Sequence, residues 1–267
     1  MMKIGFIGLG NMGGSLACLV AQDKRFRSEL LLANRSRDKA EKIAAEVGGQ
    51  PVSNAEVFAQ AEVIFLGIKP AQFEGLLADY QEVLEERDSL LLVSMAAGLS
   101  LERLEKMTPS HHRWIRMMPN TPVAVGEGVI SYALSQKAYQ ADEDLLRELL
   151  SSAGLLVKLE EKQLDAATAL AGCGPAFVYL FIEALADAGV RAGLSRDVSL
   201  QLANQTLLGA AKLSQVSGQH PAQLKDQVCS PAGSTIAGVA SLEENAFRGT
   251  VMAAVQAAYQ RTQELGK

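Results

Sequence analysis

The first residues that could carry out chemistry form a glycine-rich segment near the start of the chain. Gly8, Gly10 and Gly13 fit the spacing Gly-x-Gly-x-x-Gly, after an apolar run and before a helical pattern. In that context the first glycine allows a tight turn, the second lets the backbone approach a pyrophosphate, and the third lets strand and helix pack closely. The alternative is a glycine turn without a ligand. We expect a dinucleotide site whose phosphate loop comprises Gly8, Leu9, Gly10, Asn11, Met12 and Gly13.

The end of the second apolar run bears on which dinucleotide binds. A site for NAD usually has Asp or Glu there, to hold the ribose 2′-hydroxyl. This chain has Asn34, Arg35 and Ser36 instead, so no carboxylate repels a 2′-phosphate, while a guanidinium and a hydroxyl can bind one. We therefore expect NADPH as the cofactor, with NADH possible but weaker. The alternative is that Arg35 is a solvated turn residue and Ser36 only caps a helix.

Two further loops, at residues 68–70 and 96–98, follow apolar runs. They lie at the places where an open α/β sheet binds its ligand. Their small residues would admit a flat nicotinamide or a ribose. Asn54 lies at the start of a helical segment, where it could reach the adenosine side of the cofactor or simply cap the helix. The loop residues expected at the cofactor are Ile68, Lys69, Pro70, Ala96, Ala97 and Gly98.

A second chemical segment lies far along the chain, in an uncharged stretch from Gln227 to Leu242. A Pro-Ala-Gly turn followed by Ser-Thr and a helical run is typical of a loop that enters a helix. The free N–H groups there can hold a carboxylate without a buried cation, and the Thr235 hydroxyl could then face the reacting centre. The alternative is that Ser234 or Thr235 is an ordinary helix cap. The residues expected at the substrate are Ser230, Pro231, Ala232, Gly233, Ser234 and Thr235.

Asn120 and the distribution of lysines bear on the reaction itself. Asn120 lies in a stiff turn between Pro119 and Pro122, where it could face the reacting ring or serve only the turn. No lysine stands between Lys162 and Lys212, although a 3-hydroxyacid dehydrogenase of this layout would need one on its central helix. A site without a strong general base suits a substrate that accepts hydride readily, such as a protonated imine.

These segments must be positioned by the alternation of apolar runs and helical patterns over residues 1–160. The pattern from Ser36 to Gly48 has a capping serine and a terminating glycine, and Pro70 suits a first helical turn. Such an alternation predicts right-handed βαβ units and a doubly wound parallel sheet of Rossmann type. The predicted strands are Lys3–Ile7, Leu30–Ala33, Val63–Leu66, Leu90–Val93 and Arg113–Met117.

Residues 161–267 show no convincing strand and predict a second, all-helical domain. Its helices are rich in alanine and sparse in charge, so they cannot all face water. We expect them to form the interface of a homo-oligomer, at least a dimer; the alternative is a well-buried bundle within one chain. The uncharged stretch Ala166–Ile182 is interrupted by Gly172–Pro175, which favours two buried pieces over a membrane helix.

Composition argues against other classes of partner. The 267 residues include 25 Lys and Arg and 30 Asp and Glu, a net charge of −5, with no basic run that would favour nucleic acid or an anionic membrane. Three scattered cysteines argue against disulfides, and three histidines without helical pairing argue against a metal site. The N-terminus has no leader-like pattern, so we expect a cytoplasmic protein that acts on a small molecule.

Taken together, these motifs make the chain similar to the pyrroline-5-carboxylate reductases over nearly its whole length. The segments that carry the resemblance are Gly8–Gly13, Ile68–Pro70, Ser94–Gly98, Arg116–Pro122, Gly172–Phe177 and Asp226–Thr235. The last two, together and in this order, are specific. Two residues depart from the family pattern: Cys173 stands where serine is usual, and Ala232 where glycine is usual. Ala232 matters only if its backbone needs a positive φ.

The resemblance implies an N-terminal Rossmann domain over residues 1–160 and a helical dimerisation domain over residues 161–267. It also implies NADPH-dependent reduction of 1-pyrroline-5-carboxylate to L-proline, the last step of proline biosynthesis. The substrate carboxylate would lie on N–H groups of the Ser230–Thr235 loop, with the Thr235 hydroxyl near the ring nitrogen. The other functions open to such a chain are those of a related NADP-dependent imine or 3-hydroxyacid reductase, or of a non-catalytic NADP-sensing protein.

Overall fold

The computed structural model describes residues 2–265, which fold as two compact units. The first unit runs from the N-terminal part of the chain to Cys173 and takes in the described residues from Ala258 onward; the second is Gly174–Ala257. The boundary between the units follows Cys173, whereas the sequence analysis expects it near residue 160. The difference arises because residues 161–173 pack on the sheet of the first unit. The chain therefore crosses between the units twice.

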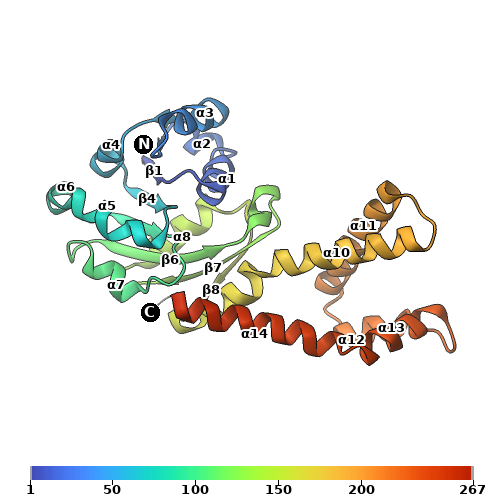
Figure 1. Ribbon diagram of the computed structural model, residues 1–267. Coiled ribbons are helices and arrows are strands. Elements are labelled where there is room, and N and C mark those ends of the chain that lie inside the picture. Colours follow the sequence, from blue (N-terminus) through green and yellow to red (C-terminus); the bar gives the residue numbers. More distant parts are fainter. Residues whose placement is uncertain (1, 266–267) are drawn as a thin grey trace. The chain divides into compact units, whose positions relative to one another are not determined.

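The first unit is built on a sheet of eight strands, counted over the described residues (Figure 1). The strand order is β3-β2-β1-β4-β5-β6-β7-β8, with strand order reversing on the two sides of β1. This is the arrangement of a doubly wound Rossmann sheet, so the predicted fold class is confirmed. The strands are β1 (Ile4–Ile7), β2 (Leu30–Ala33), β3 (Gln50–Pro51), β4 (Val63–Leu66), β5 (Leu91–Ser94), β6 (Arg113–Pro119), β7 (Gly128–Leu134) and β8 (Gly154–Lys158).

Five of these strands agree with the predicted ones to within two residues at each end, while β3, β7 and β8 are absent from the prediction. The sheet is also not wholly parallel, because β6 and β7 pair antiparallel. The short 3-10 turn η2 (Thr121–Val125) lies between them in the chain, and a parallel return would need a much longer connection. β7 does carry a strand signal that the prediction overlooks, since its sequence Gly-Val-Ile-Ser-Tyr-Ala-Leu is rich in β-branched and aromatic residues.

Helices cover both faces of this sheet. They are α1 (Asn11–Val20), α2 (Lys24–Arg27), α3 (Arg37–Val47), α4 (Asn54–Gln60), α5 (Phe73–Asp79), α6 (Gln81–Glu86), α7 (Leu101–Lys106) and α8 (Gln140–Leu149). Successive strand residues point to opposite faces. Accordingly Phe6 packs in the core beneath α1, α3 and α8, whereas Ile7 packs in the core beneath α4, α5 and α7.

Two predicted helix signals are confirmed in this unit. The helix expected from Ser36 to Gly48 is α3, with Ser36 at its N-cap position and Gly48 left-handed at φ 78° after its last turn. Pro70 opens the 3-10 turn η1 (Pro70–Gln72), which leads into α5.

The segment from residue 161 to residue 173 joins the units. It consists of the 3-10 turn η3 (Glu161–Gln163), helix α9 (Leu164–Ala167) and the five-residue π-helix η4 (Thr168–Gly172). The glycines and proline at residues 172–175 therefore distort a helix instead of separating two. By length and composition alone, the continuous stretch Glu161–Arg191 is the one candidate membrane span among the described residues.

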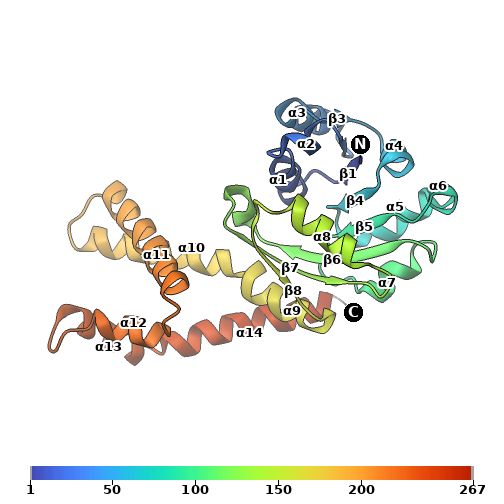
Figure 2. The same cartoon turned by 180° about the vertical axis from the view of Figure 1, so that it is seen from behind.

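In the second unit, as in all described residues after Gln163, there is no strand, which agrees with the all-helical prediction. Figure 2 shows α10 and α11 as a pair, and they contact each other extensively. Within a single chain only Ala186 of α10 is buried, so one chain alone does not bury the part of the uncharged stretch that lies on this helix. The helices are α10 (Gly174–Arg191), α11 (Arg196–Ser217), α12 (Pro221–Gln227), α13 (Ser234–Glu244) and α14 (Phe247–Leu265).

Candidate active site

The cofactor loops expected from the sequence follow neighbouring parallel strands of the first unit. In the sheet register Ile7 is paired with Ala33 on one side and Leu66 on the other, and Leu66 is paired with Ser94. The carboxyl ends of β2, β1, β4 and β5 therefore share one edge of the sheet. Strand order reverses between β1 and β4, which is where doubly wound sheets bind ligands.

The glycine-rich loop has the geometry that a pyrophosphate requires. Gly8 is left-handed at φ 91°, and a Cβ on Gly13 would lie 2.1 Å from the Gly8 carbonyl oxygen, so strand and helix touch there. A Cβ on Gly10 would meet no atom within 4 Å, which leaves space above the backbone. Gly10 is the N-cap residue of α1 and no side chain caps the helix, so its first N–H groups are available to a phosphate.

Asn34 ties the glycine loop to the end of β2. Its Oδ1 accepts a hydrogen bond from the Leu9 N–H at 3.0 Å, and its Nδ2 donates to the Ser36 carbonyl at 3.1 Å. The Ser36 hydroxyl makes no capping bond to α3, which weakens the interpretation of this residue as a helix cap alone. Arg35 is exposed and forms no ion pair within residues 2–265, whereas Arg37 nearby is paired with Glu41.

The remaining loops expected at the cofactor lie at the carboxyl ends of β4 and β5. Ser53, not Asn54, caps α4, through a capping box with Glu56, so the Asn54 side chain is not needed for capping. After β5, Gly98 is left-handed at φ 78°, and the Ala96 N–H donates to Ser94 Oγ at 3.2 Å. The residues Ile68, Lys69 and Pro70 follow β4, with Pro70 starting η1.

The contacts of Asn120 bear on the two interpretations that the sequence leaves open. Its side chain is 7% exposed; Oδ1 accepts a hydrogen bond from the Val129 N–H at 2.8 Å, and Nδ2 donates to the Ala171 carbonyl at 3.0 Å. Both ends of the amide are thus bound to main chain of the first unit. These contacts favour the structural interpretation of Asn120 over direct binding of the substrate.

The expected substrate loop lies in the second unit, between α12 and α13. Gly233 is the N-cap residue of α13, with no side-chain cap, so the interpretation of Ser234 or Thr235 as the cap is wrong. Ser234 and Thr235 at the start of α13 are exposed residues, and the Thr235 side chain has no hydrogen-bond partner among the described residues. At the other end of the loop, Asp226 is paired with Lys225 at 2.5 Å, and this contact raises the pKa of the lysine.

The backbone of this loop shows why glycine is usual at residue 232, where this chain has alanine. Ala232 is left-handed, with φ 56°, a conformation that glycine adopts without cost and alanine does not. The Gly233 N–H donates to the Ser230 carbonyl at 3.1 Å, and a Cβ on Gly233 would lie 2.3 Å from Ser230 Oγ. A larger residue at position 233 would have to displace the Ser230 hydroxyl, and the residue before it is an alanine in a strained conformation.

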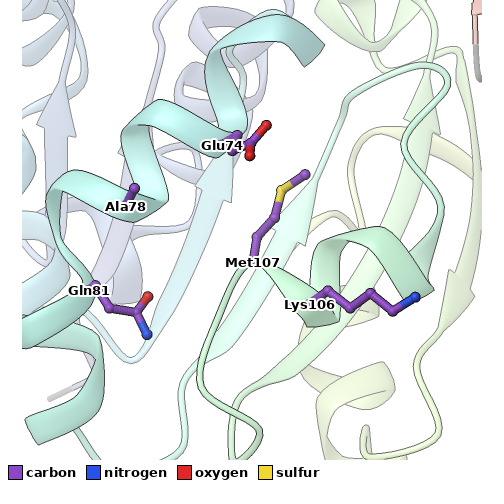
Figure 3. Close-up of a pocket in the computed structure, with 5 residues that line it drawn as sticks. All are labelled: Glu74, Ala78, Gln81, Lys106 and Met107. Atoms are coloured by element: carbon purple, nitrogen blue, oxygen red, sulfur yellow. The ribbon is translucent and has the colours of Figure 1, made fainter.

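A cavity on the first unit lies away from these loops. The one in Figure 3, of about 400 Å³, lies between α5, α6 and α7 on the first unit and is lined by Glu74, Ala78, Gln81, Lys106 and Met107. None of these residues follows a strand at the carboxyl edge of the sheet. Within the described part of the chain, no group of three or more His, Cys, Asp or Glu side chains could hold a metal ion.

The structure also reveals a buried cation that the sequence analysis does not single out. Arg116, on β6, has a side chain 5% exposed that contacts Asp165 at 2.8 Å and Glu161 at 3.3 Å. The only signal for it is an arginine inside a run of strand residues, where a lone charge needs a partner. Its partners lie 45 and 49 residues further along the chain, so the sequence does not identify them.

Comparisons with known proteins agree with this layout. A family model described as "Pyrroline-5-carboxylate reductase dimerisation" matches residues 161–265, and one described as "NADP oxidoreductase coenzyme F420-dependent" matches residues 3–98. The pyrroline-5-carboxylate reductase of Glycine max is 44% identical to this chain over 98% of the chain and 95% of the relative.

The other relatives extend the match across distant organisms and to a solved structure. The pyrroline-5-carboxylate reductase of Synechocystis is 39% identical over 100% of this chain and 99% of its own length. The crystal structure of Plasmodium falciparum pyrroline carboxylate reductase with NADP bound superposes with a TM-score of 0.86, at 36% identity, over 100% of this chain and 98% of that one. Since the similarity extends from end to end at these identities, the chain belongs to the pyrroline-5-carboxylate reductase family.

Proposed function

We propose that this chain is an NADPH-dependent enzyme that reduces 1-pyrroline-5-carboxylate to L-proline, the last step of proline biosynthesis. The observation that carries the proposal is the end-to-end similarity to a protein named pyrroline-5-carboxylate reductase, at 44% identity. The uncharged helix-entry loop before α13 supports it, because a protein that only binds a dinucleotide has no need of a second anion-binding loop.

The residues present fit the cofactor. The N–H groups at the start of α1 would take the pyrophosphate, and the open space above Gly10 leaves room for it. Arg35 and Ser36 would bind the 2′-phosphate, and Asn54 would lie on the adenosine side. The loops at residues 68–70 and 96–98 would hold the ribose and nicotinamide. When bound, NADPH supplies the hydride that reduces the C=N bond.

The substrate would be held by the loop at residues 230–235. The N–H groups at the start of α13 would bind its carboxylate, and the Thr235 hydroxyl would donate to or accept from the ring nitrogen. The carbon of a protonated imine is already electrophilic, so no strong general base is needed. The protein's contribution is then chiefly to orient the ring carbon and to exclude water.

We further propose that the enzyme is a cytoplasmic homodimer joined through its C-terminal helices. Within the second unit, apolar side chains that would be buried in a finished core are exposed, such as Leu180 at 67% and Met252 at 67%. An apolar cavity of about 520 Å³ lies between α10, α13 and α14, lined in part by Phe177, Phe181 and Phe247. The three cysteines are free thiols, as expected in a reducing compartment.

The deciding experiment is an assay of NADPH oxidation on adding 1-pyrroline-5-carboxylate, with proline identified as the product. Rapid turnover supports the proposal. Turnover only on a linear 3-oxoacid, or only on an imine without the carboxylate, would favour a related reductase. Tight NADPH binding without turnover on any of these compounds would favour a sensor of NADP.

A further inference from the structure

Residues 96–98, proposed to lie at the ribose and nicotinamide of the cofactor, belong to a short connection between β5 and α7. This β5–α7 connection comprises residues 95–100. At the sheet end, the Ala96 N–H donates to Ser94 Oγ at 3.2 Å. Within the connection Gly98 is left-handed, at φ 78°. The shape of so short a segment depends on both of its ends, so the contacts at the start of α7 matter as much as those at the sheet.

The start of α7 is fixed by a carboxylate that comes from much further along the chain. Glu161 Oε1, in η3, accepts a hydrogen bond from the Leu101 N–H at 2.6 Å, a span of 60 residues. Leu101 is the first residue of α7, so its N–H has no acceptor within the helix. The Ser100 hydroxyl accepts from the Arg103 N–H instead, at 3.2 Å. Glu161 therefore binds an N–H group that the serine cap does not bind.

Arg116 holds this carboxylate in place. Its Nη1 contacts the same Glu161 oxygen at 3.3 Å, and its Nη2 donates to Asp165 Oδ1 at 2.8 Å. The Arg116 side chain is 5% exposed and points to the sheet face that α7 covers, since Trp114, two residues earlier, packs in the core on that face. In the sheet register Arg116 is paired with Ser94. The guanidinium thus lies beside the start of the β5–α7 connection and binds the carboxylate that fixes its end.

From these contacts we propose that Glu161 is a positioning residue for the nicotinamide half of the cofactor, and that Arg116 orients it. By accepting from the Leu101 N–H, Glu161 fixes the far end of the β5–α7 connection and thereby the backbone at residues 96–98. If that backbone were loose, binding would have to order it, and NADPH would bind more weakly. The inference rests on the proposed function, and all of its residues belong to the first unit.

Two carboxylates on one guanidinium give a matched pair of variants. The side chains of Glu161 and Asp165 are each 31% exposed, and both bind Arg116, but Glu161 also binds the Leu101 N–H. Glu161→Ala removes the bond to the β5–α7 connection together with one ion pair. Asp165→Ala removes an ion pair with the same arginine and leaves that bond in place. Glu161→Gln keeps an oxygen that can accept from Leu101 but has no charge.

The readouts are the Kd of NADPH, the Kd of adenosine 2′,5′-bisphosphate, which lacks the nicotinamide half, and the unfolding midpoint in urea. In Glu161→Ala we expect the Kd of NADPH to rise by about tenfold, as for one charge-assisted hydrogen bond, and the Kd of the bisphosphate to stay within about twofold. Glu161→Gln should keep the Kd of NADPH within about threefold of that of the unaltered protein. Asp165→Ala should lower the unfolding midpoint as much as Glu161→Ala does, with both Kd values within about twofold.

Three outcomes would overturn the inference. They are an unchanged Kd of NADPH in Glu161→Ala, equal weakening of NADPH and the bisphosphate in that variant, or an equal loss of NADPH affinity in Asp165→Ala. An unaltered protein that binds NADPH but does not turn over 1-pyrroline-5-carboxylate would contradict the proposed function, and the same binding constants would still decide this inference. An unaltered protein that does not bind NADPH would overturn both.

Discussion

At the scale of single residues, the side chain of Asn34 links two loops at the end of β2. It accepts from the Leu9 N–H and donates to the Ser36 carbonyl, so it joins the glycine loop to the loop that would bind the 2′-phosphate. A carboxylate in the same place could accept the first bond but could not donate the second. It would also repel the phosphate. The amide therefore makes both connections and adds no negative charge.

Arg35→Asp tests the assignment of the 2′-phosphate. We expect the Kd of NADPH to rise by at least tenfold more than the Kd of NADH, because only NADPH carries the phosphate. Titration of each cofactor by fluorescence quenching measures both constants. Arg37→Asp is the control, since Arg37 is exposed and pairs with Glu41 on α3. Equal weakening of both cofactors by Arg35→Asp would contradict the assignment.

Thr235→Ala tests the substrate loop. Removing the hydroxyl should lower kcat by about tenfold, the equivalent of one hydrogen bond in the transition state, with the Kd of NADPH unchanged. Steady-state kinetics with 1-pyrroline-5-carboxylate measure the first quantity and equilibrium titration the second. Thr235→Ser keeps a hydroxyl and should recover most of the rate. Unaltered kinetics in Thr235→Ala would remove this residue from the site.

Ala232→Gly tests the strain in the same loop. At φ 56° an alanine Cβ is crowded, so glycine should raise the free energy of unfolding by about 0.5–1 kcal/mol in spite of its more flexible unfolded state. Urea denaturation measures it. The matched control is Ala237→Gly, inside α13, which should lower the same quantity by about 1 kcal/mol. Loss of stability in both variants would show that Ala232 is not strained.

At the scale of elements, the two helices proposed to bind ligands share a glycine at the N-cap position. α1 and α13 both start after a glycine, and neither has a side-chain cap. Helices α3, α5 and α6 also lack a side-chain cap, but none of them begins after a glycine. Helices α4, α7 and α11 are capped by the hydroxyls of Ser53, Ser100 and Ser195. A capped helix has used one of its free N–H groups, whereas an uncapped one leaves them all to a ligand. Two helices that begin in this way suit the two anionic groups of the proposed reaction.

Two glycine substitutions at the start of α1 should separate packing from cofactor binding. Gly13→Ala places a Cβ 2.1 Å from the Gly8 carbonyl oxygen, and we expect it to lower the free energy of unfolding by several kcal/mol. Gly10→Ala meets no protein atom within 4 Å, so stability should change little while NADPH binding weakens by tenfold or more. Denaturation and titration measure the two effects. NADPH affinity unchanged in Gly10→Ala would contradict the proposed pyrophosphate position.

The sequence predicts those elements whose signals are local. The strands beginning at Leu30 and Val63 are continuous apolar runs, and their ends place the loops proposed to bind the cofactor on one edge of the sheet. β8 lies at the sheet edge with its residues exposed or half-buried, so its hydrophobic pattern is weak. The bond from Asn120 to Ala171 spans 51 residues, and no local pattern reveals a contact of that range. The capping box that frees Asn54 needs only Ser53 and Glu56, and it is a signal the sequence does offer.

At the scale of the whole molecule, the second unit of a single chain has apolar side chains that are exposed and that a second subunit could bury. Leu180→Glu introduces a charge at a position 67% exposed on α10, and we expect it to shift a dimer toward monomer. Light scattering after size exclusion measures the mass. Val125→Glu, at a position 76% exposed on the first unit, is the control and should leave the mass unchanged. A dimer unaffected by Leu180→Glu would place the interface elsewhere.

The second unit is a single uninterrupted stretch, Gly174–Ala257, with first-unit chain on both sides of it. A recombination event that exchanges only this stretch between relatives would therefore transfer the proposed substrate loop together with helices α10 to α13 and the first part of α14. The loops proposed to bind the cofactor, which belong to the first unit, would stay as they are. Replacing this one stretch of sequence could therefore change both the substrate that such an enzyme reduces and the subunits with which it assembles.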